Sequence, residues 1–304
     1  MSELDLVGEG CVGGALLRVA CVQYAMRRVG GFGDFEEQVV FHLEAAAKDF
    51  RADIVVLPEY FSAQLLSGEA PMESHEGIRW LAGQTAGVVD MLLKQAARLG
   101  VVIVAGSQPV ITDAGRLENV AMVIQPDGSL ATQPKLHITP WERDCWGIEG
   151  GGSLVVVDTP KARVGVLVCY DVEFPEAARA LADRGVDLLC VPYCTDDRQG
   201  HLRVTRCAAA RAIENQVYVA TAGVVGQLPG VPSMNVHYGR SAVFSPCDFG
   251  FARDGIVAEA DPNVETLLVA ELDPAALYRS REEGSVRPLQ DRRPDLFSFR
   301  DEVG

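Results

Sequence analysis

GVLVCYDVEFPE, residues 165–176, contains the clearest local signal in the chain. Its first part is a short apolar run without alternation, which is typical of a strand buried on both faces. Pro175 and the alanine-rich residues after it have helical spacing that stops at Gly185. Cys169 is therefore predicted at the tip of a buried strand, where the chain turns into a helix. Its thiol is either a nucleophile or a small apolar group at the end of a core strand.

Strands and helices alternate on both sides of this segment. We predict helices at residues 34–50, 85–99, 175–185 and 202–214. We predict strands at residues 16–23, 53–57, 101–105, 154–158, 163–169, 188–191, 217–222, 240–244 and 266–271, and a hairpin from residue 120 with its turn at 126–128. This order indicates a single α/β (mixed α+β) domain over residues 1–304 with mixed sheets. Residues 1–15 are a lead-in, and the charged tail at 279–304 is expected to wrap a neighbouring surface or to be partly disordered.

The composition limits the classes of protein and of partner. The chain has 304 residues, 48% of them hydrophobic and 23% charged, which is ordinary for a soluble globular enzyme. Its formal charge of −15 argues against nucleic acid and anionic membranes as partners, because both need clustered Lys and Arg. The acidic N-terminus and the lack of a long apolar run predict a cytoplasmic protein. The eight cysteines are scattered, which is typical of reduced residues rather than of a disulfide scaffold.

Neither a cofactor nor a metal is expected. GEGCVG at residues 8–13 matches the dinucleotide pattern G-x-G-x-x-G, but it precedes a strand, whereas that site requires glycines that follow a strand and open a helix. No C-x-x-C or H-x-x-x-H pair occurs, and Cys190 and Cys194 lie in a strand-to-loop context that does not suit a metal site.

Polar groups with catalytic potential follow several predicted strands. Glu59 lies just past a buried strand, where desolvation would raise its pKa and make it a usable base; the alternative is a helix or turn cap. Lys135 is either a snorkelling surface residue or an oxyanion stabiliser. Glu142 is a second carboxylate or the ion-pair partner of Arg143. His137 suggests a Cys-His dyad, but a structural role is favoured.

Three sequence blocks carry a family resemblance. VVLPEYF, PKLHITPWE and GVLVCYDVEFPE, which hold Glu59, Lys135 and Cys169 in that order, resemble the three signature blocks of the nitrilase superfamily of carbon-nitrogen hydrolases. ARAIEN at residues 210–215 is similar to the structural R-x-x-E-N segment of the same family, and the likeness extends over residues 16–277. The resemblance implies an αββα four-layer sandwich, with two mixed β-sheets face to face and helices outside. It also implies that subunits pair as a homodimer or a larger homo-oligomer.

The resemblance also implies roles for individual residues. Cys169 matches the nucleophile, Glu59 the general base and Lys135 the oxyanion-stabilising residue, with the backbone N–H of Tyr170 as a further oxyanion donor. Glu142 matches the second glutamate that positions substrate or water, in preference to Glu149. Four further candidates for substrate contact are Tyr60, Trp141, Arg198 and His201. In the segment 191–204, Arg198, His201 and Arg203 either meet a substrate carboxylate or are solvated loop residues.

The implied reaction is hydrolysis of a small-molecule amide to a carboxylic acid and ammonia through a cysteine thioester, without a cofactor. Tyr170 and Asp171 after the nucleophile resemble the amidase-like branches, whereas nitrile hydrolysers of the family tend to carry Trp-Glu there. Hydrolysis of an N-carbamoyl amino acid or amine, nitrile hydrolysis and a catalytically silent scaffold are the alternatives. The Gly- and Pro-rich residues 223–238 suit a shaped entrance loop, and whether they form a lid is open.

Overall fold

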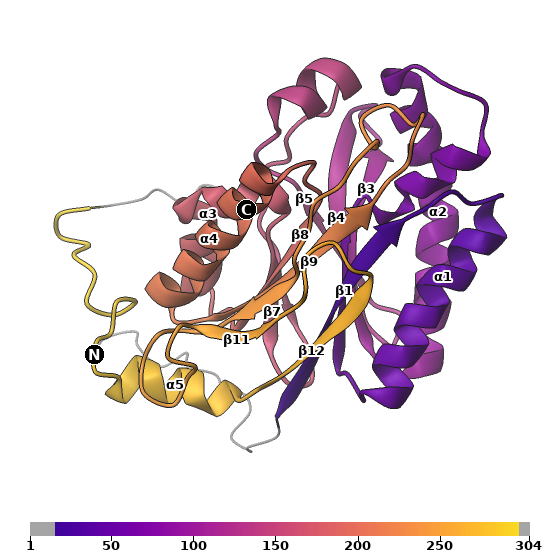
Figure 1. The fold of residues 1–304 in the computed structure, drawn as a ribbon. Coiled ribbons are helices and arrows are strands. Elements are labelled where there is room, and N and C mark those ends of the chain that lie inside the picture. The colour runs from indigo at the N-terminus through magenta and orange to yellow at the C-terminus, as the bar shows by residue number, and fades with distance from the viewer. Residues whose placement is uncertain (1–15, 298–304) are drawn as a thin grey trace.

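Two β-sheets form the centre of the molecule (Figure 1). The structure is a computed structural model that describes residues 16–297, so the glycine pattern at residues 8–13 and the rest of the predicted lead-in lie outside the described residues, as does the end of the tail. Among the residues described, no helix is long and apolar enough to cross a membrane.

Each sheet is mixed, with parallel strands in its middle. The first sheet has the order β5 (Leu130–Pro134), β4 (Leu117–Ile124), β3 (Val102–Ile111), β2 (Ile54–Glu59), β1 (Leu17–Met26), β12 (Thr266–Leu272). The second has the order β6 (Val156–Asp158), β7 (Arg163–Val166), β8 (Leu188–Tyr193), β9 (Tyr218–Gly226), β10 (Ala242–Phe244), β11 (Ile256–Glu259). A short parallel pairing of residues 24–26 with residues 224–226 joins β1 to β9 and so links the sheets.

Helices cover the outer face of each sheet (Figure 1). The helices over the first sheet are α1 (Phe32–Glu44), which continues into a π-helical turn η1 (Ala45–Asp49), and α2 (Ser74–Leu99). Those over the second sheet are α3 (Pro175–Asp183) and α4 (Arg198–Asn215), and a last helix, α5 (Pro274–Glu283), follows β12. The order of layers is helices, sheet, sheet, helices. The αββα sandwich that the resemblance implied is therefore confirmed.

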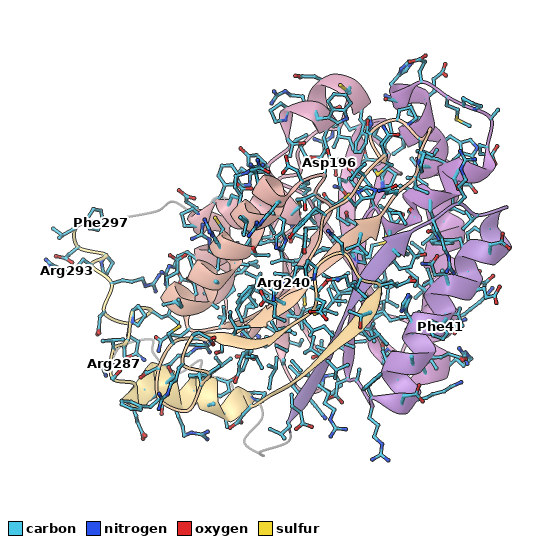
Figure 2. All side chains as sticks on the ribbon, in the orientation of Figure 1. Phe41, Asp196, Arg240, Arg287, Arg293 and Phe297 are labelled. Carbon is cyan, nitrogen blue, oxygen red and sulfur yellow. The ribbon has the colours of Figure 1, made fainter. Side chains whose placement is uncertain are left out.

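The alternation of β1 shows why the central strands read as continuous apolar runs. Val19 and Cys21 belong to the core between the sheets, whereas Ala20 and Val22 belong to the core under α1 and α2. Successive side chains of a strand point to opposite faces, and here both faces are covered. Side chains fill the spaces between the ribbons on both sides of this strand (Figure 2).

Several element boundaries differ from those predicted. The helix predicted at residues 85–99 is the second half of α2, which begins at Ser74 because Ile78 and Leu81 continue its buried stripe. Gly77 and Gly83 weaken the helical signal over that first half. The strand predicted at 163–169 ends at Val166, and the chain then turns into a 3₁₀ helix, η4 (Cys169–Glu173).

The region after β12 is more ordered than predicted. Residues 274–283 form α5, although we expected a tail from residue 279. The local signals were Asp273, whose side chain accepts a hydrogen bond from the N–H of Ala275, and Pro274 in the first turn. Leu277 is fully buried and anchors the helix. Before β12, the short strand β11 was likewise not predicted.

Candidate active site

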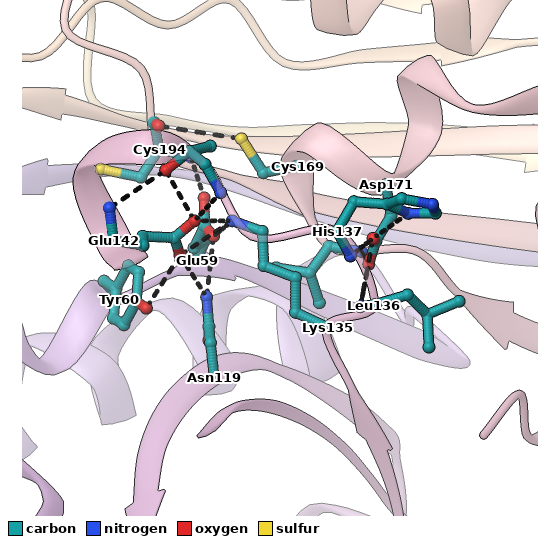
Figure 3. A network of polar contacts seen from close by, with 12 residues as sticks. Glu59, Tyr60, Asn119, Lys135, Leu136, His137, Glu142, Cys169, Asp171 and Cys194 are labelled. Carbon is teal, nitrogen blue, oxygen red and sulfur yellow. Dashed lines mark hydrogen bonds and ion pairs between the residues drawn. The ribbon is translucent and has the colours of Figure 1, made fainter. Parts of the chain in front are cut away.

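Glu59, the last residue of β2, is buried at the centre of a polar network (Figure 3). Its Oε1 accepts hydrogen bonds from Lys135 Nζ at 2.9 Å and from Asn119 Nδ2 at 3.0 Å, and its Oε2 accepts one from the backbone N–H of Cys194 at 2.9 Å. Burial raises the pKa of the carboxyl above its usual value; Lys135 opposes this rise and Glu142 adds to it. The desolvated carboxylate expected after this strand is therefore present.

A glycine of the neighbouring strand β3 allows the backbone of β3 to pack closely against the end of β2. Gly106 of β3 has φ +52°, and a Cβ at that position would overlap the carbonyl oxygen of Pro58. The pairing of β3 with β4 shifts its register between Val104 and Ser107, and the backbone N–H of Tyr60 donates to the carbonyl of Ser107 at 3.1 Å. The bulged glycine thus lets β3 pass close to the residue before Glu59.

Lys135, directly after β5, is a buried charge, with only 1% of its surface exposed. Its Nζ donates to Glu59 Oε1 at 2.9 Å and to both carboxylate oxygens of Glu142, at 2.9 and 2.8 Å. Burial alone would lower the pKa of this lysine, but the two carboxylates hold it well above its usual value. The snorkelling surface interpretation is therefore wrong, and the ammonium is charged inside the protein.

Glu142 begins a short π-helical turn, η3 (Glu142–Trp146). Besides Lys135, its carboxylate accepts hydrogen bonds from the hydroxyl of Tyr60 at 3.0 Å and from the backbone N–H and hydroxyl of Thr139 at 3.1 and 2.8 Å. Burial opposes ionisation, but Lys135 lowers the pKa of Glu142 below its usual value. Glu142 therefore does not pair with Arg143, whose guanidinium contacts Asp144.

Glu149, the alternative to Glu142, is exposed at the surface. The geometry thus favours Glu142 as the second glutamate of the cluster.

Cys169 opens the 3₁₀ turn η4 with φ +50°, a left-handed conformation that is uncommon for residues other than glycine. The side chain is buried, and its Sγ lies 3.9 Å from the carbonyl oxygen of Cys194 (Figure 3). Burial and the carboxylate of Glu59 raise the pKa of the thiol well above its usual value. The resting group is therefore a neutral thiol. Tyr170 is the second residue of the turn, where a backbone N–H has no acceptor within the turn itself.

Asp171 connects the turn that begins at Cys169 to the segment after β5 that contains Lys135. Its carboxylate is fully buried and accepts hydrogen bonds from the backbone N–H groups of Val168 at 3.3 Å and of His137 at 2.7 Å. The Nδ1 of His137 lies 2.9 Å from the same carboxylate. Sequence reasoning missed this role, although Asp171 stands two residues after Cys169 in the segment quoted first.

His137 contacts this carboxylate and also stacks on Phe174 with a ring separation of 3.6 Å. This agrees with the structural role favoured from the sequence. Asn119, which donates to both Glu59 and Glu142, was also missed. Asn119 and Glu118 are the two polar residues of the otherwise apolar strand β4, and nothing in the neighbouring sequence distinguishes Asn119.

A cavity of about 450 Å³ opens beside this network. Its walls include Glu59, Lys135, Glu142, Cys169, Tyr170 and two of the candidates for substrate contact, Tyr60 and Trp141. Trp141 is 54% exposed, and its Nε1 donates to the hydroxyl of Ser233 at 2.9 Å. No group of three or more His, Cys, Asp and Glu side chains within residues 16–297 is arranged to hold a metal ion.

The other two candidates do not line this cavity. Arg198 is the exposed first residue of α4, and His201 is buried with its Nδ1 3.3 Å from the hydroxyl of Tyr193. The reason is that α4 begins at residue 198 rather than at the predicted residue 202, so helical spacing brings other residues to the cavity. These are Gly200, Arg203 and Val204.

The loop predicted at residues 223–238 begins later, because β9 continues to Gly226. The segment from residue 227 to residue 241, which we call the entrance loop, connects β9 to β10. Three of its residues, Ser233, Met234 and Asn235, line the cavity. The position is that of the shaped entrance loop expected from the Gly and Pro content.

Comparisons with known proteins agree with this geometry. A family model described as carbon-nitrogen hydrolase matches residues 18–282. The chain belongs to this family. The resemblance carried by the three sequence blocks is thereby confirmed.

The relatives are named as hydrolases and amidases. The "Probable hydrolase YhcX" of Bacillus subtilis is 40% identical over 281 residues, which cover 92% of this chain and 54% of that protein. This chain thus spans about half the length of that curated relative. The "Omega-amidase NIT2-A" of Xenopus laevis is 32% identical over 263 residues, which cover 84% of this chain and 87% of that protein.

A solved structure is also similar. It is a glutamate-to-glutamine mutant of the amidase from Nesterenkonia sp. AN1, showing covalent addition of the acetamide moiety of fluoroacetamide at the active site cysteine. The likeness has a TM-score of 0.71 and 25% sequence identity, and it covers 92% of this chain and 95% of the other.

Proposed function

We propose that this chain hydrolyses a small-molecule amide to a carboxylic acid and ammonia, through a thioester on Cys169. The main observation in support is the buried ammonium of Lys135, which forms ion pairs with both Glu59 and Glu142. These residues line a cavity that Cys169 also lines. The family, together with the omega-amidase and amidase relatives, supports an amide as the bond that is cleaved.

In the acylation step Cys169 attacks the amide carbonyl while Glu59 takes the thiol proton. A thiol whose pKa is raised needs such a base, and a carboxyl whose pKa is also raised can accept the proton near neutral pH. Lys135 and the N–H of Tyr170 hold the negative charge that forms on the carbonyl oxygen. Interactions of this kind are worth about 3 kcal/mol each. Glu59 then returns the proton to the leaving nitrogen, and ammonia departs.

In the deacylation step water replaces ammonia. Glu59, ionised again, removes a proton from a water molecule that Glu142 helps to orient, and the hydroxide attacks the thioester carbonyl. Collapse of the second tetrahedral intermediate breaks the C–S bond, returns a proton to Cys169 and releases the acid. Every group that moves a proton in this sequence belongs to the chain, so the route needs no cofactor.

The test combines ammonia release with detection of the acyl-enzyme. Wild-type protein, Cys169→Ala and Glu59→Gln are compared on primary aliphatic amides, ω-amides, N-carbamoyl amino acids and nitriles. Intact-mass measurements after rapid acid quenching report any adduct. We expect wild-type turnover of at least one amide, no turnover by Cys169→Ala, and a mass increase equal to the acyl group that maps to the peptide containing Cys169.

Turnover of a nitrile or of an N-carbamoyl compound in preference to every amide would replace the proposed substrate class. Turnover that persists in Cys169→Ala would overturn the thioester route. A wild-type protein that hydrolyses nothing in the panel, and whose Cys169 also fails to react with iodoacetamide, would favour the silent scaffold.

A further inference from the structure

The main chain of one residue touches both the base and the nucleophile. The backbone N–H of Cys194 donates to Glu59 Oε2 at 2.9 Å, and the carbonyl oxygen of Cys194 lies 3.9 Å from the Sγ of Cys169 (Figure 3). Cys194 directly follows β8, so its backbone has no further strand to fix it on its C-terminal side. The spacing between Glu59 and Cys169 therefore depends on whatever holds Cys194 in place.

The entrance loop holds it. The Sγ of Cys194 lies 3.5 Å from the Nδ1 of His237, and either group can donate, according to the tautomer of the histidine. Two hydrogen bonds join the residues that follow Cys194 and His237. The N–H of Tyr238 donates to the carbonyl of Thr195 at 2.8 Å, and the hydroxyl of Thr195 donates to the carbonyl of Tyr238 at 2.7 Å. These contacts attach the base of the entrance loop to the segment that carries Cys194.

The imidazole of His237 is placed firmly at this point. Its side chain is buried, with the residue only 4% exposed, and its backbone N–H donates to the carbonyl of Gly226 at the end of β9. Burial lowers the pKa of His237 to about 4, so the ring is neutral at neutral pH. A neutral imidazole can contact a thiol without adding a charge beside Glu59.

Residues nearer the tip of the same loop also contact the cavity wall. The hydroxyl of Ser233 accepts a hydrogen bond from the indole of Trp141, the residue before Glu142, and Met234 lines the cavity wall. The entrance loop therefore contacts the catalytic cluster through Trp141 at its tip and through Cys194 at its base.

We propose that His237 is a positioning residue that, through Cys194, holds Glu59 and Cys169 at the spacing needed for proton transfer. The inference rests on the proposed function, since the proton transfer is the one written for the thioester route. His237 is not among the residues that line the cavity, and its ring contacts the Sγ of Cys194. Its loss is therefore expected to slow the chemical step rather than to weaken substrate binding.

Two substitutions of His237 distinguish the effect of losing the hydrogen bond to Cys194 from the effect of losing the volume of the ring. His237→Leu removes the hydrogen-bonding atom, whereas His237→Asn keeps an amide atom near the place of Nδ1. We expect kcat of His237→Leu to fall about 10- to 100-fold, because small misplacements of reacting groups have effects of that size. We expect KM to change less than about threefold, and His237→Asn to recover most of the lost kcat.

His42→Leu is the matched control. His42 is also buried at 4% exposure, and it lies on the buried face of α1 with its Nε2 3.0 Å from Glu265 Oε1. It has the same burial but no contact with the catalytic cluster, so its replacement should lower the temperature of unfolding while kcat stays near wild type. If His237→Leu does not fold, Cys194→Ala removes the other half of the contact and is expected to lower kcat in the same way.

The inference is overturned if kcat of His237→Leu, or of Cys194→Ala where the first variant does not fold, stays within about twofold of wild type. It is also overturned if KM rather than kcat carries the loss, or if His237→Asn is as slow as His237→Leu.

A second readout separates this inference from the proposed function. If the wild-type protein hydrolyses no amide, the proposed function fails, and the rate of alkylation of Cys169 by iodoacetamide, followed by peptide mapping, is measured instead. A slower rate in His237→Leu but not in His42→Leu supports the positioning role, and equal rates reject it.

Discussion

Lys135 is charged inside the protein because two carboxylates face it at hydrogen-bonding distance. A buried ion costs several kcal/mol in lost hydration, and only close partners of opposite charge offset that cost. With Glu59 and Glu142 ionised, the cluster has a net charge of −1. Moving the Cys169 proton to Glu59 leaves that sum unchanged, because the thiolate takes over the charge that the carboxylate loses. The step therefore places no additional charge in the buried site.

The pH dependence of kcat/KM should reflect Glu59 on the acid side. Burial raises the pKa of Glu59 above the ordinary value of 4.5, so protonation removes the base at a higher pH than for an ordinary carboxyl group. Activity is then full above this raised pKa and is lost as the pH falls through it. We expect the midpoint of the acid limb to lie above 4.5 in a profile of kcat/KM measured between pH 4 and pH 9.

Asn119→Ala provides a directional control for this assignment. The amide of Asn119 donates to the ionised form of Glu59, so its removal should raise the midpoint further. Circular dichroism across the same pH range shows whether the fold persists. A midpoint at or below 4.5 in folded protein, or one that Asn119→Ala moves downward, would contradict the assignment to Glu59.

The sequence identifies candidate site residues best when they lie in distinctive local patterns. Glu59, Lys135 and Cys169 each lie in a recognisable block, and the structure brings them together. Cys194 has no such pattern, because its role depends on a hydrogen bond to a residue 135 positions away. His237 likewise acts through a contact between a loop and a strand end, which no spacing along the chain reveals.

At the scale of elements, the site forms where several strands end. Glu59 ends β2, Lys135 follows β5 and Cys194 follows β8, while Cys169 comes after β7. The apolar runs predict where these strands lie, and with them the groups at their ends. The exact ends are less predictable, as β7 shows by stopping three residues before Cys169. There the chain leaves the sheet for a 3₁₀ turn whose left-handed first residue has no signal in composition.

The approach of β3 to the end of β2 gives a prediction about stability. Gly106→Ala must adopt φ +52° and also overlaps the carbonyl oxygen of Pro58. The left-handed conformation costs about 1–2 kcal/mol for a residue with a Cβ, and overpacking adds about 1–3 kcal/mol. We expect the free energy of unfolding, measured with urea, to fall by the sum of the two effects, and kcat to fall because Glu59 follows directly after Pro58.

Gly128→Ala isolates the conformational part of that cost. Gly128 has φ +88° in the turn between β4 and β5, and no atom lies within 4 Å of the position that a Cβ would take. This variant should lose only about 1–2 kcal/mol of stability and should keep its kcat. Equal losses of stability in the two variants, with unchanged kcat in both, would show that the contact with Pro58 does not position Glu59.

At the scale of the whole molecule, alternating strands and helices predict an α/β domain but do not select its layers. Runs such as residues 54–57 are apolar on both faces, which fits a sheet covered by helices on both sides as well as a sheet covered by helices and a second sheet. The resemblance selected the four-layer sandwich, and the two separate cores on the faces of β1 are consistent with it. The homodimer implied by the same resemblance stays a prediction.

The charge of the molecule extends into the cavity. The chain has a formal charge of −15, and besides the buried group of Glu59, Lys135 and Glu142 the cavity is lined by Glu173, Asp196, Asp197 and Arg203. Arg203 is 63% exposed and lies 3.5 Å from Glu173, whose side chain is only 18% exposed. The guanidinium end of this pair is mostly exposed to water, which weakens its hold, so an ammonium group of a substrate can take the place of Arg203 beside Glu173. The N-terminus of α4, which would otherwise attract an anion, is already capped by Asp197.

We therefore expect amides with a distant ammonium group to react faster than amides with a distant carboxylate. The matched pair is 4-aminobutanamide and glutaramate, which place opposite charges at the end of the same three-methylene chain. At low ionic strength kcat/KM should favour the ammonium compound by about tenfold, because a cavity of one sign concentrates ligands of the other. In 1 M salt the ratio should shrink, since the Debye length falls to about 3 Å. Glu173→Gln should narrow the ratio at low salt, whereas faster hydrolysis of glutaramate at every salt concentration would show that the acidic wall does not select the substrate.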